Sequence, residues 1–154
     1  MPKIVMTLPE AEIFLESNFI GQLSTIGKEG YPYTVPLDYV YWEKKIYFHC
    51  APKGQKLLNI IHNPRVCFTV YRVDKIDLKE TPCKSATRYH CVQVFGTARC
   101  LDPLPLKTKI LQVFMEHFAA GRPFHPITDE MAATCAIVEI RPDRISGKKN
   151  IEPE

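Results

Sequence analysis

The sequence predicts a mainly β protein, an antiparallel β-barrel or sandwich with inserted helices. Six stretches are rich in Val, Ile, Tyr, Phe and Thr, a composition typical of β-strands. Only three or four segments have helical periodicity, and they do not alternate strictly with the strands, which disfavours a doubly wound parallel sheet. The 154 residues show no internal repeat and no linker, so we expect a single domain over residues 1–154.

The first third of the chain predicts one helix followed by strands. Thr7 and Glu10 fit a capping box, in which each side chain bonds the backbone amide of the other residue, so a helix begins after Thr7. Pro36 lies inside a strand-like run and has no amide hydrogen to donate, so it marks an edge, a bulge or an opening in the sheet. The strands expected here are 19–26, 31–42 and 46–50.

The rest of the chain predicts three more strands, at 65–73, 89–101 and 134–140. Gly96 lies inside the second of these and indicates a bulge or a tight bend. Residues 74–87 are polar and predict an irregular segment, and Arg141-Pro142 and Gly147 interrupt the tail.

Three further helical segments are expected, at 55–62, 104–118 and 128–133. The first is short and ends at Asn63-Pro64, because the residue before a proline disfavours helical backbone angles. Its apolar residues are expected to lie mostly inward: Leu57, Leu58, Ile60 and Ile61.

Charge and hydropathy exclude several functional classes. The net charge of +3 comes from scattered basic residues and does not predict a nucleic-acid surface. No apolar run is long enough to cross a bilayer, so we expect no membrane association. The N-terminus lacks the apolar region and the cleavage site of a signal peptide, so we expect a cytoplasmic protein.

The six cysteines do not predict a disulfide framework or a metal site. A disulfide framework needs a secreted context, and a structural zinc site usually shows a C-x-x-C pair; both are lacking here. Four of the six lie in apolar strand-like runs, where Cys is usually a small buried hydrophobic residue: Cys67, Cys91, Cys100 and Cys135.

Residues 48–60, FHCAPKGQKLLNI, join a strand to a helix through a loop that contains Gly54, with Lys53 and Lys56 on either side. A helix N-terminus presents free amides and partial positive charge, so this loop can hold a phosphate. It is not a Walker loop, because G-x-x-x-x-G-K-[ST] does not occur. On local sequence the loop is either an anion site or a plain connection with solvated lysines.

Two other stretches carry chemically capable residues. The run YPYTVPLDYVYW, residues 31–42, either lines a pocket for a flat ring or forms an ordinary aromatic edge strand. His49 and His90 each precede a cysteine and resemble metal ligands in type but not in spacing, so no metal site is predicted. No nucleophile elbow or Ser-His-Asp order is present, and nothing indicates hydrolysis.

Four segments in this order resemble one family: GYPYTVPLDYVY, KIYFHCAPKGQKLLNIIHNPRVCFTV, TRYHCVQVFGTARCL and DRISGKKN. They resemble the pyridoxamine-5′-phosphate-oxidase-like flavin-binding split barrels, and within them the nitroimidazole-resistance proteins. The resemblance runs from about Gly21 to about Lys149. It implies a six-stranded antiparallel split β-barrel and a homodimer with FMN at the subunit interface.

The resemblance also implies roles for single residues. His49 would contact the substrate or deliver a proton, and Lys56 is the strongest candidate to bind the cofactor phosphate. Cys50 stands where relatives often carry Ser or Thr. The strand along the flavin ring would be Tyr33, Thr34, Val35, Pro36 and Leu37. The phosphate would be received by His49, Cys50, Ala51, Gln55 and Lys56. The residues that approach the flavin from the partner subunit would be Arg88, Tyr89, His90, Cys91 and Val92. The closing segment of the family motif would contribute Lys148.

The function implied is an FMN-binding oxidoreductase that reduces small aromatic or nitro compounds. The alternatives are a non-catalytic flavin carrier or sensor, a haem-binding split barrel with His49 or His90 as the iron ligand, and a deazaflavin-binding split barrel.

Overall fold

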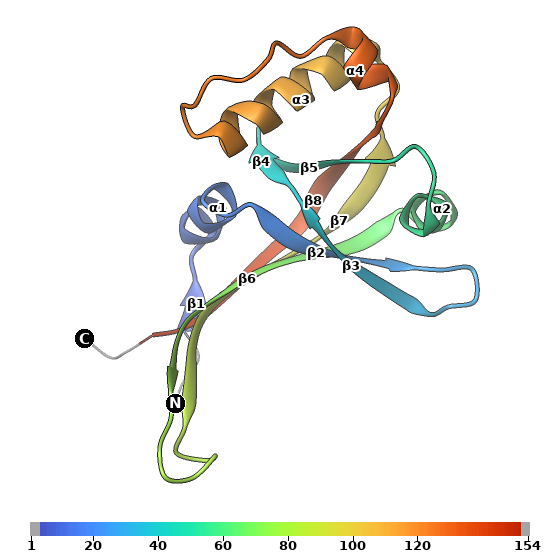
Figure 1. The fold of residues 1–154 in the computed structure, drawn as a ribbon. Helices are drawn as coiled ribbons and strands as arrows, with labels where there is room; N and C mark the ends of the chain where they lie inside the picture. Colours follow the sequence, from blue (N-terminus) through green and yellow to red (C-terminus); the bar gives the residue numbers. More distant parts are fainter. Residues whose placement is uncertain (1–3, 152–154) are drawn as a thin grey trace.

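The computed structural model describes residues 4–151 and consists of a strongly curled antiparallel sheet with helices at its margins (Figure 1). The elements in chain order are β1 (Ile4–Met6), α1 (Leu8–Glu16), β2 (Ile20–Ile26), β3 (Pro32–Asp38), β4 (Val40–Trp42), β5 (Lys45–Cys50), α2 (Gln55–His62), β6 (Arg65–Asp77), β7 (Ala86–Cys100), α3 (Leu104–Ala119), α4 (Asp129–Ala133) and β8 (Ala136–Asn150). The prediction of a mainly β antiparallel fold with inserted helices is confirmed.

The strands lie in the order β3-β2-β6-β7-β8-β5-β4, and β1 pairs with the outer part of β8. The two strands at the ends of this order, β3 and β4, are consecutive in the chain and separated only by Tyr39. The chain therefore leaves one edge of the sheet and enters the other at a single residue, which makes the sheet curl on itself. The predicted strand 31–42 is two strands for this reason, and with β1 the strands within residues 4–151 number eight rather than six.

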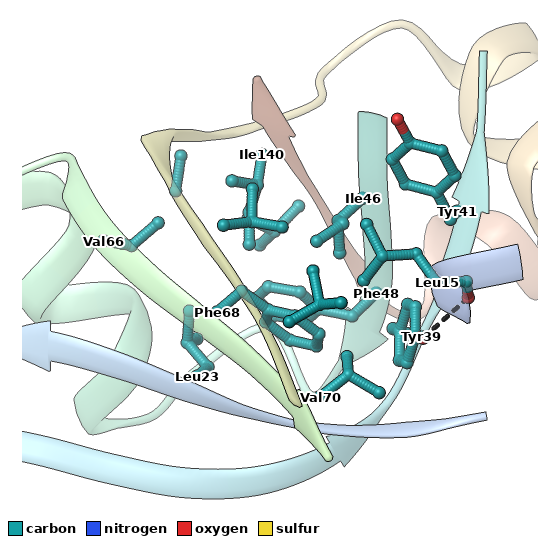
Figure 2. Packing of buried hydrophobic residues seen from close by; sticks show 14 of the residues in the cluster. Leu15, Leu23, Tyr39, Tyr41, Ile46, Phe48, Val66, Phe68, Val70 and Ile140 are labelled. Carbon is teal, nitrogen blue, oxygen red and sulfur yellow. Dashed lines mark hydrogen bonds between the residues drawn. The ribbon is translucent and has the colours of Figure 1, made fainter. Parts of the chain in front are cut away.

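Tyr39 is fully buried at this crossing. Its hydroxyl donates to the carbonyl oxygen of Leu15 at 2.7 Å (Figure 2), and its ring meets Phe68 edge to face with 5.0 Å between centroids. The polar end of the side chain is thus satisfied by α1, while its ring packs in the barrel core. Burial raises the pKa of the Tyr39 hydroxyl, so this group stays neutral.

The core fills the inside of the curled sheet with buried side chains from seven of the described strands, all but β3, and from α1 and α2 (Figure 2). Its fully buried members include Leu15, Leu23, Ile46, Phe48, Phe68, Val70 and Ile140. A second apolar cluster lies where α3 covers β4, β5 and β8, and it contains Val40, Tyr47, Leu101, Ile110, Phe114 and Ile137. Burial on both sides fixes the strands that lead into the loop before α2.

Two irregularities expected from the sequence are present. Pro36 lies on β3, an edge strand, where a missing amide hydrogen costs no ladder bond. The β7–β8 register shifts between Phe95 and Gly96, so Gly96 marks a bulge. A side chain there would begin 2.3 Å from the carbonyl oxygen of Arg141, which explains the glycine.

The prediction that the last strand ends at Ile140 is wrong, because β8 continues to Asn150. Pro142 pairs with Gly96 at the bulge, a position that tolerates a residue without an amide hydrogen. Residues 74–87 are likewise more regular than predicted. Lys75–Asp77 pairs with Ala86–Arg88 in a long hairpin that projects from the barrel (Figure 1), and Asp77 binds Arg88 at 2.6 Å.

Helix α1 begins with the expected capping box: the Thr7 hydroxyl accepts from the Glu10 amide, and a Glu10 carboxylate oxygen accepts from the Thr7 amide at 2.7 Å. Helix α2 has the predicted bounds, but its predicted inward face is partly wrong. Leu57 and Ile60 are buried against the barrel, whereas Leu58 and Ile61 are 61% and 77% exposed. Leu57 and Ile60 are three residues apart and share one face of the helix, and Leu58 and Ile61 share the next. The barrel covers only the first of these two faces.

The cysteines are all free thiols. Of the four cysteines expected to be buried, Cys67, Cys91 and Cys135 are half-buried, and Cys100, the last residue of β7, is exposed. Within residues 4–151, no cluster of three or more His, Cys, Asp or Glu side chains could hold a metal ion. No helix in this part of the chain is long and apolar enough to span a membrane.

Candidate functional site

The loop from β5 to α2 leaves an open helix N-terminus. Gly54 is the N-cap of α2 with φ of 147°, a left-handed conformation that other residues rarely adopt, and no atom lies within 4 Å of where its side chain would start. The first helical amides that bond back to Gly54 are those of Leu57 and Leu58. The amides of Gln55 and Lys56 come before them and have no carbonyl within the helix. They are available to an anion.

Lys56 supplies the positive charge at this position. In residues 4–151 no carboxylate forms an ion pair with Lys56 or Lys53. Burial raises the pKa of the nearby Cys50 thiol, and the Lys56 ammonium opposes that shift. The Cys50 thiol is therefore neutral, and it is a weak hydrogen-bond donor rather than a nucleophile.

A buried polar chain fixes α2 against the barrel. The Gln55 side-chain amide donates to the Asn59 side-chain oxygen at 2.7 Å, and the Asn59 amide donates to the Thr25 hydroxyl at 2.9 Å. Asn59 is 2% exposed and Thr25 is 1% exposed. The Thr25 hydroxyl in turn lies 3.4 Å from the carbonyl oxygen of Tyr33 on β3. These hydrogen bonds connect the first turn of α2 to β3, the strand expected from the sequence to lie along a flavin ring.

Sequence reasoning did not single out Thr25 or Asn59. The signal that could have found Asn59 is its place between Leu57 and Ile60 on the inward side of α2, four residues after Gln55. A polar residue at an inward position needs a partner, and the i, i+4 spacing supplies one.

Strand β3 presents an unpaired outer edge beside this helix. Its residues alternate as a strand requires: Val35 and Leu37 pack on the core, whereas the Thr34 hydroxyl lies 2.9 Å from the Ser24 hydroxyl. A hollow of about 350 Å³ joins the start of β3 to α2, and its lining includes Tyr33, Gln55 and Asn59. The structure thus brings the start of β3, at Tyr33, beside the first turn of α2, at Gln55.

His49 lies at the end of β5 with an exposed side chain. Its ring meets that of Phe114 on α3 edge to face, with 4.7 Å between centroids. Ala51 follows Cys50 in the exposed loop. The aromatic contact holds the imidazole near the loop while leaving it accessible.

Residues 88–92 and Lys148 form a separate group on β7 and β8, where Cys91 pairs with Lys148. Arg88 is buried and bonds Asp77, the Asn150 side chain and the Ile151 carbonyl, and Val92 is fully buried in the core. His90 bonds Asp74 at 2.7 Å and stacks on Phe14.

This second group is distant from α2 along the sheet. Helix α2 adjoins the other end of β7, where the Ala98 amide bonds Pro64 just after the helix. Six residues of extended strand, about 20 Å, separate Ala98 from Val92. One chain does not bring the two groups together, and a contribution of 88–92 from a partner subunit stays a prediction.

Residues 8–149 match the family model described as pyridoxamine 5′-phosphate oxidase. The chain belongs to the pyridoxamine 5′-phosphate oxidase family. The match spans every element from α1 through nearly all of β8, including the loop before α2 and the edge strand β3. No protein with a curated description matches this family member significantly.

Solved structures share the fold of this pyridoxamine 5′-phosphate oxidase family member. A provisionally assigned 5-nitroimidazole antibiotic resistance protein from Bacteroides thetaiotaomicron is 21% identical with a TM-score of 0.83; the match covers 96% of this chain and 87% of that one. A FAD and heme binding protein from Mycobacterium smegmatis is 16% identical with a TM-score of 0.86, covering 100% and 76%. A FAD-binding protein from Mesorhizobium loti is 23% identical with a TM-score of 0.73, covering 98% and 100%. At these identities the likeness establishes the fold.

Proposed function

We propose that this chain binds FMN through the α2 N-terminus and the outer edge of β3, and that it reduces small aromatic or nitro compounds. The observation that carries the proposal is the anion site at α2. Two free amides, the left-handed Gly54 with open space around it and the unpaired Lys56 lie together at one helix end. Such a site suits a phosphate, and the edge strand beside it leaves backbone groups for a flat ring.

The names of similar proteins support this assignment. They include a nitroimidazole resistance protein, two FAD-binding proteins, one FAD and heme binding protein and an F420 reductase. These share a flavin or a related redox cofactor more often than any other ligand. With the family membership, they favour redox chemistry over hydrolysis or nucleic-acid binding.

Each residue of the site has a role in this proposal. When bound, the flavin supplies the electron transfer, and the protein supplies binding and orientation. Lys56 and the amides of Gln55 and Lys56 bind the phosphate. Cys50 replaces a hydroxyl donor with a neutral thiol, so the charge of Lys56 carries more of the phosphate affinity. His49 contacts the substrate, since its ring is exposed beside the loop and held by Phe114.

We also propose that the functional unit is a homodimer. The β6–β7 hairpin carries exposed large apolar side chains at Tyr71, Val73, Ile76 and Leu78. Such side chains on a projecting arm are typical of a protein interface. In this proposal the second copy supplies Tyr89, His90 and Cys91, which are half-buried, to the α2 side of its partner, whereas Val92 is fully buried in the core of its own chain and does not contribute.

Titration of the purified apoprotein with FMN tests the phosphate site. We expect Lys56→Ala to weaken FMN binding at least tenfold, about 1.4 kcal/mol or more, because it removes the formal charge at the anion site. Lys44→Ala is the matched control, since the Lys44 side chain is 81% exposed in the turn between β4 and β5 and pairs with Glu12 at 3.8 Å, away from the phosphate site. An unchanged FMN affinity in Lys56→Ala would refute the phosphate assignment.

The absorbance spectrum and the mass of the extracted ligand separate the alternatives. A Soret band indicates haem, and a mass matching a deazaflavin excludes FMN. A carrier or sensor would bind FMN tightly without oxidising NAD(P)H in the presence of nitro acceptors, whereas the proposed enzyme turns over in that assay.

A further inference from the structure

Helix α2 has a second apolar stripe that faces solvent. Leu58 and Ile61 lie one turn apart on the side away from Leu57 and Ile60, and they are 61% and 77% exposed. Together with Leu101, just after β7, they line a groove of about 550 Å³. Apolar side chains this exposed beside a groove are typical of a surface that a partner covers.

The cations at the two ends of α2 have no acidic partners. Residues 44–73 contain six Lys or Arg residues and no Asp or Glu. Three of the six pair with carboxylates from outside this segment: Lys44 with Glu12 at 3.8 Å, Lys45 with Glu139 at 3.2 Å and Arg72 with Asp74 at 2.8 Å. Within residues 4–151 the other three form no ion pair with a carboxylate, and they lie just before, within and just after α2: Lys53, Lys56 and Arg65.

Lys107 on α3 adds a further cation on the other side of the groove. It forms no ion pair with a carboxylate in the described part of the chain, and Asp102 is the acidic residue in the groove lining. Lys56 belongs to the proposed phosphate site, so Lys53, Arg65 and Lys107 remain, with one carboxylate among them. We call the exposed stripe and these three cations the α2 surface: Leu58, Ile61, Lys53, Arg65 and Lys107.

The charges indicate which kind of partner covers the α2 surface. A two-fold interface between copies of the chain places the same patch against itself, so the cations of one copy would meet those of the other, which is unfavourable. A lipid surface also fits poorly, because two exposed apolar residues on an eight-residue helix offer little area for insertion. A different protein, with acidic side chains around a small apolar centre, complements the surface in both charge and polarity.

The α2 surface begins next to the proposed phosphate site. Leu58 follows Gln55, whose amide is available to an anion, by three residues, which is about 4.5 Å along the helix axis. A protein docked on Leu58 and Ile61 would therefore lie beside a bound flavin. Proteins that exchange electrons use small interfaces, and complementary charges speed their encounter.

We propose that the α2 surface docks an acidic electron-carrier protein, which reduces the bound flavin in place of NAD(P)H. This inference rests on the proposed flavin site and specifies a partner for it. Each docked carrier gives up one electron and leaves oxidised, so two such electrons and two protons from water reduce the flavin once. The stripe supplies the apolar contact, and the three cations supply the attraction.

Stopped-flow reduction of the FMN-loaded full-length protein tests the inference. The donors are a reduced, acidic plant-type ferredoxin and dithionite, a small reductant that needs no docking surface. We expect the ferredoxin rate of the wild type to fall about tenfold or more when salt screens the charges. At low salt, Arg65→Glu/Lys107→Glu and Leu58→Gln/Ile61→Gln should each lose about tenfold or more of that rate, and their dithionite rates should stay within about twofold of the wild type.

Lys44→Glu/Lys109→Glu is the matched control, because it makes the same change in net charge on the β4 side of the molecule. Lys44 lies in the turn after β4, and the Lys109 ammonium lies 5.0 Å from the centroid of the Trp42 ring on β4. Lys109 is two residues from Lys107 and therefore lies on another side of α3. This variant should keep the ferredoxin rate within about threefold of the wild type.

The outcomes separate the docking surface from the proposed function. A flavin that dithionite reduces and ferredoxin does not, or equal losses in the charge variant and its control, overturns the docking assignment and leaves the flavin site intact. A change from dimer to monomer in Leu58→Gln/Ile61→Gln on ultracentrifugation, or cosedimentation of the wild type with phosphatidylserine vesicles, also overturns it, because the stripe would then contact a second copy or lipid. Failure to bind FMN refutes the proposed function, and the docking assignment fails with it.

Discussion

Replacing Asn59 with alanine should loosen α2 from the barrel and lower the free energy of unfolding by about 2 kcal/mol. The change removes two hydrogen bonds, Gln55 to Asn59 at 2.7 Å and Asn59 to Thr25 at 2.9 Å. A net intramolecular hydrogen bond contributes about 0.5–1.5 kcal/mol, and a buried group left without a partner costs about 1–3 kcal/mol. The Thr25 hydroxyl, 1% exposed, is the group that loses a donor.

Urea denaturation followed by circular dichroism measures this loss. With a slope of about 2 kcal/mol per molar, the midpoint should fall by about 1 M. Gln55→Ala is the matched control: it removes only the outer of the two bonds, and the Asn59 oxygen that loses its donor lines the open hollow, where a water molecule can replace it. Since the Gln55 side chain is exposed, we expect the control to lose less than about 0.5 kcal/mol.

A double-mutant cycle with Thr25→Val isolates the buried bond. If the bond carries the effect, the loss in the double variant should fall short of the sum of the single losses by about 0.5 kcal/mol or more. Additive losses, or an Asn59→Ala protein within about 0.5 kcal/mol of the wild type, would show that apolar packing alone holds α2.

Three further predictions concern catalysis, acid stability and the bulge. His49→Ala should leave FMN bound and slow turnover in a steady-state NAD(P)H assay; loss of the cofactor would instead assign His49 to binding. The pKa of Glu10 is lowered to about 2, chiefly by its hydrogen bond from Lys149, so this pair adds stability above the ordinary carboxyl pKa of about 4.5 and loses it as the pH falls towards 2. Lys149→Met should therefore be less stable than the wild type at pH 7 in urea denaturation, with the difference shrinking between pH 4.5 and 2; a constant difference would contradict the assignment. Gly96→Ala should lower the melting temperature by several degrees in scanning calorimetry, since a methyl group would lie 2.3 Å from the Arg141 carbonyl oxygen, and an unchanged melting temperature would mean that β8 shifts freely at the bulge.

The sequence predicted those features that depend on neighbouring residues. The capping box at Thr7 and Glu10 is a local hydrogen-bond pattern, and it is present as expected. The bounds of α2 follow from glycine before it and Asn63-Pro64 after it. The edge position of Pro36 and the bulge at Gly96 follow from the missing amide hydrogen of one and the missing side chain of the other.

The features that the sequence did not predict depend on distant partners. The strand breaks at Tyr39 because β3 pairs with β2 and β4 pairs with β5, and these two partners lie in different parts of the sheet. The residues of the run 31–42 do not indicate which partners they will have. The continuation of β8 past Pro142 depends on Gly96 lying opposite it. The exposed stripe of α2 depends on which face the barrel covers, and the Asn59–Thr25 bond depends on β2 lying beneath the helix.

The strand order has a consequence for folding during synthesis. The connection from β3 to β4 through Tyr39 is a single residue, so forming it costs little loop-closure entropy. Strand β5, in contrast, lies between β4 and β8 in the sheet, and β8 is far from it in the sequence. Strand β8 is also the last of the eight to leave the ribosome, and it must insert between β7 and β5. We therefore expect a nascent chain that ends before residue 136 to expose the edges of β5 and β7, and to be the species that chaperones bind.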